Sequence, residues 1–276
     1  MKIKMIKKKI GVNLIATRHL DEFNRFKDKK IIDYIEITID NFLFCDPLSI
    51  KKMVNNIPIS FHIMNSKFIE RDLDELKIIS NKIKNFIDVL NPIYVSDHLL
   101  KFSHNGLNLP FLSEVNYIKD KDLIIERAII WQNLLNSKIY FENYSSISSI
   151  GLHQPAFLVE LVDKSDCGIL FDISNAYIAS KNLNKDTSMW DQVIEISKHF
   201  HVGGFSTFGD SGIYIDSHDR PIDIEAKKWL SEISRKIETL TIEYDHEIDY
   251  SLWEKDIKDI RKLMRNINET KSLTES

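Results

Sequence analysis

The feature that most constrains the fold is an alternation, repeated eight times, between short runs rich in Ile, Val, Phe and Tyr and longer amphipathic segments. This alternation is typical of a parallel sheet built from β-then-α units. The predicted strands are Ile10–Ile15, Tyr34–Asp40, Ile59–Met64, Ile93–Leu99, Lys138–Tyr144, Gly168–Asn175, Phe200–Phe205 and Leu240–Asp245. The predicted helices include Asp72–Leu90, Lys121–Leu135, Pro155–Lys164, Ile222–Ile237 and Leu252–Asn266.

Most of these strands are apolar on both sides, as expected where a barrel interior and an outer layer of helices bury both faces. Eight such units in 276 residues match the size of a (β/α)8 barrel. A doubly wound open sheet is the alternative, but it usually has a glycine-rich loop after its first strand, and Gly11–Arg18 contains a single glycine. We therefore predict an α/β protein with a (β/α)8 TIM barrel. One domain is expected over residues 1–276, with a core of about residues 10–266 and a polar C-terminal tail.

Charge and cysteine content limit the functional classes. The net charge is -4 and the pI is about 6.2, so the chain lacks the basic excess that drives binding to DNA or RNA. Cys45 and Cys167 form no CxxC pair and cannot build a disulfide framework, which favours a reducing compartment. The basic N-terminus is interpreted as a lysine-flanked first strand, because Asn13 and Arg18 interrupt the apolar run that follows it. No window approaches the roughly 20 apolar residues of a membrane helix, and we predict a cytoplasmic protein.

Side chains that bind metals recur on strands three to eight or just beyond them. They are His62, His98, Glu142, Asp172, Asn175, His201, Glu243 and Asp245, with Asp216 and His218 in the loop that follows the seventh strand. In a barrel the carboxyl ends of the strands meet at one mouth, so these side chains are expected to share a pocket. Burying so many charges together costs several kcal/mol for each unpaired charge unless a cation compensates. The pattern therefore predicts a polynuclear metal site.

The types of ligand narrow the choice of metal. Imidazole and carboxylate groups without cysteine favour Fe, Mn or Zn over a calcium site or an iron–sulfur cluster. The remaining histidines are predicted to lie on helices or loops, at the surface or outside the ligand shell; they are His19, His104, His153, His199 and His246.

Several motifs resemble a known family and keep its order over roughly residues 10 to 262. They are Asp33–Glu36, Phe61–Met64, Tyr94–His98, Glu142–Tyr144, Leu170–Asp172, Ser174–Ala176, Phe200–Val202, His218–Arg220 and Ile248–Tyr250. The chain resembles the MbnB-type methanobactin biosynthesis oxidases, which belong to the multinuclear non-heme iron-dependent oxidative enzymes and have a (β/α)8 fold.

The resemblance implies a site for two or three iron ions, in mixed Fe(II)/Fe(III) states. Its ligands would be His62, His98, Glu142, Asp172, Asn175, His201, Asp216, His218 and Glu243. Asn143 and Asp245 are predicted as catalytic residues. The implied reaction is a dioxygen-dependent, four-electron oxidation of cysteine in a ribosomally made, MbnA-like precursor peptide, giving an oxazolone and a thioamide. The implied partner is an MbnC-like protein that forms a heterodimer with the chain.

Three alternatives remain open. Barrel endonucleases that cut abasic DNA use a trinuclear zinc cluster with a similar ligand order, but the aspartate on their sixth strand is followed three residues later by His, where this chain has Asn175. A sugar isomerase of the xylose isomerase type normally uses fewer histidines and a lysine. A metal-stabilised docking scaffold would need a coordinatively closed site.

Overall fold

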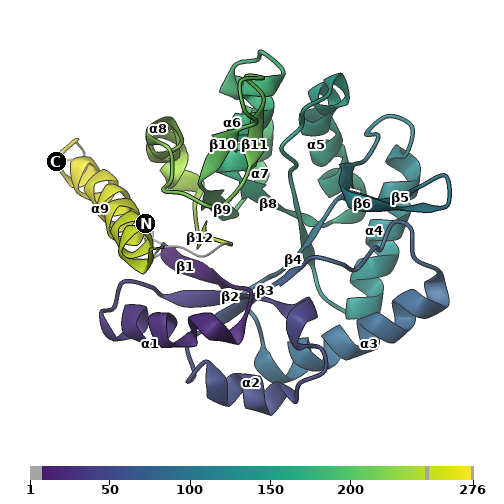
Figure 1. Ribbon diagram of the computed structural model, residues 1–276, viewed down its shortest axis with the longest axis horizontal. Coiled ribbons are helices and arrows are strands. Elements are labelled where there is room, and N and C mark those ends of the chain that lie inside the picture. Colours follow the sequence, from purple (N-terminus) through teal and green to yellow (C-terminus); the bar gives the residue numbers. More distant parts are fainter. Residues whose placement is uncertain (1–7, 246–248, 275–276) are drawn as a thin grey trace.

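The computed structural model describes residues 8–245 and 249–274, which form a closed barrel of parallel strands with helices around it (Figure 1). Neighbouring strands follow the order β1-β12-β9-β8-β7-β4-β3-β2, so the ring is wound in sequence order and closes where β1 pairs with β12. The barrel strands are β1 (Lys9–Leu14), β2 (Tyr34–Thr38), β3 (Ile59–Ile63), β4 (Val95–His98), β7 (Ile139–Glu142), β8 (Gly168–Asp172), β9 (His199–Gly203) and β12 (Thr239–Glu243). The predicted (β/α)8 barrel is confirmed.

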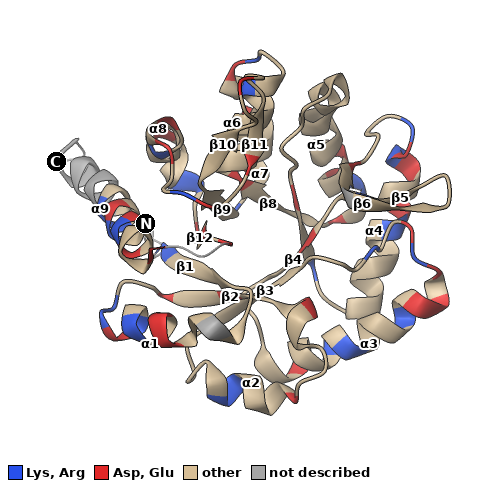
Figure 2. Cartoon of the chain, viewed as in Figure 1, with Lys and Arg blue, Asp and Glu red and all other residues tan. Residues whose placement is uncertain are grey.

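Helices form the outer layer of the barrel. They are α1 (Leu20–Asp28), α2 (Pro47–Met53), α3 (Leu73–Leu90), α4 (Lys121–Leu135), α5 (Gln154–Ser165), α6 (Ile173–Asn182), α7 (Asp191–Ile196), α8 (Ile224–Ile233) and α9 (Tyr250–Thr274). Short 3-10 helices are η1 (Thr17–His19), η2 (Ile39–Phe42), η3 (Ser149–His153), η4 (Thr187–Trp190) and η5 (Ser234–Lys236). Within the described ranges, no helix is both long enough and apolar enough to span a membrane. Charged side chains lie mainly on the outer helices and loops (Figure 2).

The sixth predicted strand and the last predicted helix end at other residues in the structure than the sequence patterns indicated. The predicted strand Gly168–Asn175 ends early at Asp172, whose carboxylate accepts a hydrogen bond from the Asn175 backbone N–H at 2.6 Å and thereby caps α6. Asn175 therefore lies in the first turn of a helix and not on a strand. The last helix runs to Thr274, beyond the predicted end at Asn266, and neither proline nor glycine interrupts its sequence.

Two antiparallel hairpins extend from the carboxyl ends of the barrel strands, and the predicted elements do not include them. They are β5 (Leu100–His104) with β6 (Leu107–Glu114) and β10 (Phe205–Thr207) with β11 (Tyr214–Asp216). Asn105 and Gly106 have φ values of 49° and 78°, the left-handed pair that an Asn-Gly turn adopts between two strands. His104 and Asp216 therefore end strands, and their predicted placement in loops was wrong.

Aromatic side chains fill the barrel interior near the amino ends of the strands. Tyr94 stacks on His199 with 4.3 Å between ring centroids, and Tyr140 meets the same imidazole edge-on at 4.4 Å. His199 is buried at the start of β9, and its Nδ1 lies 2.8 Å from Thr239 Oγ1. Burial lowers the pKa of His199 to about 4. His199 is thus a core histidine, and its predicted position on a helix or loop was wrong; His246 lies outside the described residues.

Replacing Gly11 tests the packing of this interior. A Cβ atom at position 11 would lie 2.5 Å from the Tyr34 ring, which is itself fully buried. We expect Gly11→Ala to lower the free energy of unfolding by about 1–3 kcal/mol through overpacking, measured by urea denaturation. In a Tyr34→Leu background the same change should cost less. An unchanged denaturation midpoint for Gly11→Ala would contradict this packing.

Candidate metal centre

A cavity of about 450 Å³ opens at the carboxyl ends of the barrel strands. The predicted site residues that line it are His62, His98, Glu142, Asn143, Asn175, Asp216, His218, Glu243 and Asp245. The two other predicted ligands, Asp172 and His201, are fully buried and lie against this lining. The fold therefore gathers every predicted site residue in one place.

The first ligand group consists of His62 on β3, His98 on β4 and Glu142 on β7. Glu142 Oε2 lies 2.9 Å from His98 Nδ1 and 3.4 Å from His62 Nε2. Ser96 Oγ lies 2.8 Å from His62 Nδ1 and so orients the other ring nitrogen toward Glu142. One ligand atom from each residue of the group lies within 4.8 Å of the others, which is close enough to hold one metal ion.

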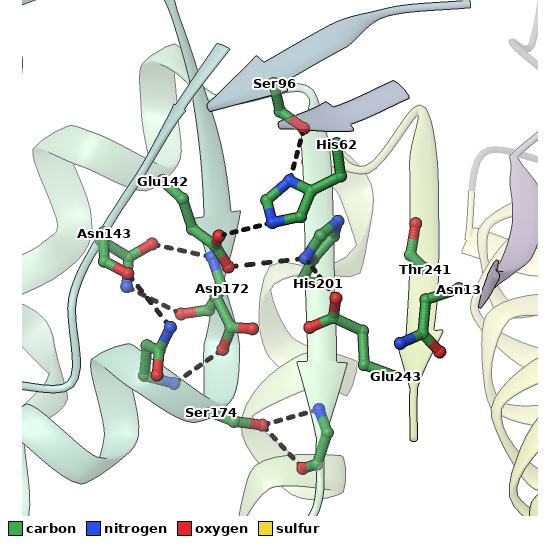
Figure 3. A network of polar contacts seen from close by, with 12 residues as sticks. Asn13, His62, Ser96, Glu142, Asn143, Asp172, Ser174, His201, Thr241 and Glu243 are labelled. Carbon is green, nitrogen blue, oxygen red and sulfur yellow. Dashed lines mark hydrogen bonds and ion pairs between the residues drawn. The ribbon is translucent and has the colours of Figure 1, made fainter. Parts of the chain in front are cut away.

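The second group shares Glu142 with the first. It contains Glu142, Asp172, His201 and Glu243, all buried, with ligand atoms again within 4.8 Å of one another. His201 Nδ1 lies 3.1 Å from Glu243 Oε1 and 3.4 Å from Glu142 Oε1 (Figure 3). The two oxygens of Glu142 thus face different groups, which is the arrangement that a bridging carboxylate needs.

Asp216 and His218 lie beside Glu243 at the edge of the second group. His218 Nε2 is 2.7 Å from Asp216 Oδ1 and 3.7 Å from Glu243 Oε2. The backbone of His218 has φ 45°, a left-handed conformation that non-glycine residues rarely adopt. Gly203 makes room for the ring, because a Cβ atom there would lie 2.3 Å from His218 Cδ2. Both features hold the imidazole over the site.

The site contains carboxylates that its own histidines do not fully balance. Burial, and then the negative charges of Glu142 and Glu243, raise the pKa of Asp172 well above its usual range. Burial also opposes ionisation of Glu142, but His98, His201 and His62 together outweigh it and hold the Glu142 pKa well below the ordinary value. Burial and the neighbouring His98 lower the pKa of His62 to about 4. A cation between these groups would relieve both the repulsion and the cost of burial.

Unpaired ligand atoms point to the same conclusion. Six buried atoms of the predicted ligands have no hydrogen-bond partner among the described residues: Glu142 Oε2, Asp172 Oδ2, Asn175 Oδ1, both ring nitrogens of His201, and His218 Nε2. A buried polar atom without a partner is costly, and such atoms are rare except where a ligand completes them. The nitrogen and oxygen donors also match the ligands that iron, manganese and zinc accept. The residues present therefore fit a metal cluster.

The two predicted catalytic residues contact the ligands. The amide of Asn143 donates to the Asp172 backbone carbonyl at 2.9 Å and accepts from the Asp172 N–H at 2.7 Å, so both of its polar atoms hold that segment. Asp245 lies 3.0 Å from His218 Nδ1 and accepts a hydrogen bond from Asn13 at 2.8 Å. These contacts orient ligands, and a direct part in the reaction stays a prediction for both residues.

The sequence reasoning missed Glu36 on β2. Its side chain is buried, and its Oε1 lies 2.7 Å from His201 Nε2. A signal was available, because Glu36 is the one charged residue within the strand Tyr34–Thr38. Asn13 was missed for the reason that an uncharged residue in β1 carries little information on its own.

Removing the shared carboxylate tests the centre. We expect Glu142→Ala to lose at least one metal ion per chain, because both groups use this side chain, while the barrel stays folded. Elemental analysis of the purified protein measures the metal, and circular dichroism checks the fold. His153→Ala, at the exposed end of η3, is the matched control and should retain the full metal content. Equal metal content in both variants would contradict the proposed groups.

Residues 9–272 match a family described as the RiPP precursor modification enzymes MbnB/TglH/ChrH. A UPF0276 protein of Caulobacter vibrioides (strain NA1000 / CB15N) is 25% identical over 207 residues, which cover 71% of this chain and 72% of that protein. A UPF0276 protein of Vibrio parahaemolyticus is 27% identical over 255 residues, covering 87% and 86%.

Solved structures show the same fold at low sequence identity. A xylose isomerase-like TIM barrel protein from Mycobacterium smegmatis, in complex with magnesium, has a TM-score of 0.66 and 12% identity, over 95% of this chain and 98% of that one. Endonuclease IV from Thermus thermophilus has a TM-score of 0.56 and 13% identity, over 94% and 99%. These two likenesses show the fold alone. The family match covers every strand of the barrel and every predicted ligand, and the chain belongs to the MbnB/TglH/ChrH family of RiPP precursor modification enzymes.

Proposed function

We propose that this chain is a dioxygen-dependent, non-heme multi-iron oxidase that modifies cysteine in a ribosomally made, methanobactin-type precursor peptide. The observation that carries the proposal is the pair of buried ligand groups joined by Glu142, on a chain of a peptide-modifying family. The product is an oxazolone with a neighbouring thioamide. Four electrons and four protons leave the peptide and reduce one dioxygen to two waters, so the reaction balances without a further reductant.

The ligand groups suggest how the chain holds two or three iron ions. His62, His98 and Glu142 would hold one ion, and Glu142 would bridge it to a second at Asp172, His201 and Glu243. Asn175, Asp216 and His218 extend the set on the side of Glu243 and would serve a third ion. Bound iron supplies the redox capacity and the open coordination position that dioxygen chemistry on a thiol needs.

The cavity suggests how the substrate is placed. Its lining combines the ligands with the apolar side chains of Ile15, Leu99, Leu100 and Leu112, so a cysteine side chain could reach the centre while neighbouring peptide groups contact apolar surface. Such a lining excludes water from the reacting side chain. Metal ions bound at these ligands would lower the pKa of a thiol held beside them.

Cellular location and partner belong to the same proposal. Cys45 and Cys167 are both free, which fits the reducing cytoplasm. Exposed apolar side chains occur on segments that follow the carboxyl ends of four barrel strands; they are Phe44 after β2, Leu107 after β4, Ile147 after β7 and Phe208 after β9. Apolar groups gathered around a mouth are typical of a surface that another protein covers. We assign this mouth surface (Phe44, Leu107, Ile147 and Phe208) to an MbnC-like partner that helps to bind an MbnA-like precursor.

The reaction is tested with the chain, the product of its neighbouring gene and a cysteine-containing precursor peptide encoded beside them. We expect two or three iron ions per chain and a loss of four hydrogens from the peptide by mass spectrometry, in air but not under anaerobic conditions. The Glu142→Ala complex is the control for dependence on the metal centre. Zinc in place of iron, an unchanged peptide mass and cleavage of abasic DNA would assign the chain to the endonuclease class instead.

The mouth surface is tested separately. We expect the double variant Leu107→Asp/Phe208→Asp to weaken binding of the partner at least about tenfold, because charged groups would replace two exposed apolar contacts. Isothermal titration of the purified proteins measures the affinity. Ile196→Asp at the opposite end of the barrel, where α7 leads into β9, is the matched control. Equal affinities for wild type and double variant would reject this surface as the interface.

A further inference from the structure

Glu36 places a charge beneath the metal centre, away from solvent. The side chain is only 1% exposed and lies on β2, across the barrel from His201 on β9. Its Oε1 lies 2.7 Å from His201 Nε2. Its Oε2 accepts hydrogen bonds from the Tyr94 hydroxyl and from Ser60 Oγ, the latter at 3.3 Å. Hydrogen bonds therefore hold Oε2 in place, and Oε1 is in close ion-pair contact with the imidazole.

The imidazole of His201 separates Glu36 from the other acidic ligands. On one side of the ring Nδ1 faces Glu142 and Glu243 at 3.4 and 3.1 Å, and on the other side Nε2 faces Glu36. A flip of the ring would bring carbon atoms to both places, whereas the observed orientation places a ring nitrogen beside the carboxylates on each side. Glu36 is absent from the ligand groups because the ring lies between it and them.

We propose that Glu36 is a positioning residue of the metal centre: it accepts the Nε2 proton of His201 and thereby makes Nδ1 the nitrogen that binds metal. The inference rests on the metal centre proposed above. A carboxylate that accepts from the outer nitrogen of a ligating histidine fixes its tautomer and its ring orientation, and makes the inner nitrogen a stronger donor. Tyr94 supports the arrangement from the next layer, because its hydroxyl also lies 3.2 Å from Thr241 Oγ1.

Glu36 also has a role in charge balance. Among the described residues no lysine or arginine forms an ion pair with it, and His201 is its ion-pair partner. The negative charge of Glu36 would therefore reach the metal through one imidazole. Replacing the carboxylate with an amide keeps the shape but removes that charge, and this separates a positioning role from a purely steric one.

The test uses zinc, so that it does not depend on iron or on turnover. Protein labelled with 15N-histidine is loaded with Zn(II), and the His201 nitrogens are assigned by comparison with His201→Ala. We expect Nδ1 of His201 to show the shift of a metal-bound nitrogen and Nε2 to carry the proton. Zn(II) affinity is then measured by competition with a chelator for wild type, Glu36→Gln and Glu254→Gln.

We expect Glu36→Gln to weaken the Zn(II) site at His201 about tenfold or more, and to have no further effect in the His201→Ala background. Glu254→Gln makes the same chemical change in a carboxylate that pairs with Lys29 on the outside of the barrel, and should bind zinc like wild type. If Glu36→Gln does not fold, Tyr94→Phe, which removes one donor to Glu36, should weaken the same site about threefold.

Several outcomes would overturn the inference. They are metal bound through Nε2 of His201, wild-type zinc affinity in both Glu36→Gln and Tyr94→Phe, or a full effect of Glu36→Gln in the absence of the His201 imidazole. Zinc binding with the expected dependence on Glu36, but without peptide oxidation by the iron-loaded complex, would support the role of Glu36 and reject only the proposed reaction. A wild-type protein that binds no metal would overturn both.

Discussion

The main physical constraint on this structure is the free-energy cost of burying several like charges close together. Four carboxylates and four imidazoles meet at the barrel mouth, and Asp172 and His201 among them have no contact with solvent. Neither hydrogen bonds nor the histidines alone satisfy this set, as the unpaired atoms of Glu142 and Asp172 show. A cation would compensate such an arrangement. The closed barrel makes the arrangement sustainable, because its hydrogen-bonded strands keep the ligand backbones from separating.

A second layer of side chains fixes the directions in which the ligands point. Ser96 contacts His62, Asp245 contacts His218, and Glu36 contacts His201, each at the ring nitrogen opposite the cavity or beside it. Each contact removes rotational freedom that a ligand would otherwise lose when metal binds. The conformational entropy of these side chains is therefore lost during folding, and the donors would already be aligned when a metal ion binds. Beneath them, the Tyr94 ring stacks on His199 and its hydroxyl donates to Glu36.

Sequence patterns predicted the barrel because each strand is a short apolar run, and predicted the ligands because parallel strands end at one mouth. Helix α4 has the predicted bounds, whereas the predicted sixth strand is too long, because Asp172 caps the next helix. The sequence does not assign Glu36 to the barrel interior, because β2 is buried on both faces and alternation along it does not show which side chains point inward. His199 was placed outside the sheet because the predicted strand Phe200–Phe205 begins one residue later than β9 does.

The closure of the ring between β1 and β12 sets an order of events during synthesis. Asn13 on the first strand bonds to Asp245 just beyond the last, 232 residues later, and Glu243 on that last strand completes the second ligand group. Until those residues leave the ribosome, the nascent chain holds only part of the set, exposed to water and without its final neighbours. The complete set of predicted ligands can therefore come together only when the barrel closes, after the last strand has been synthesised.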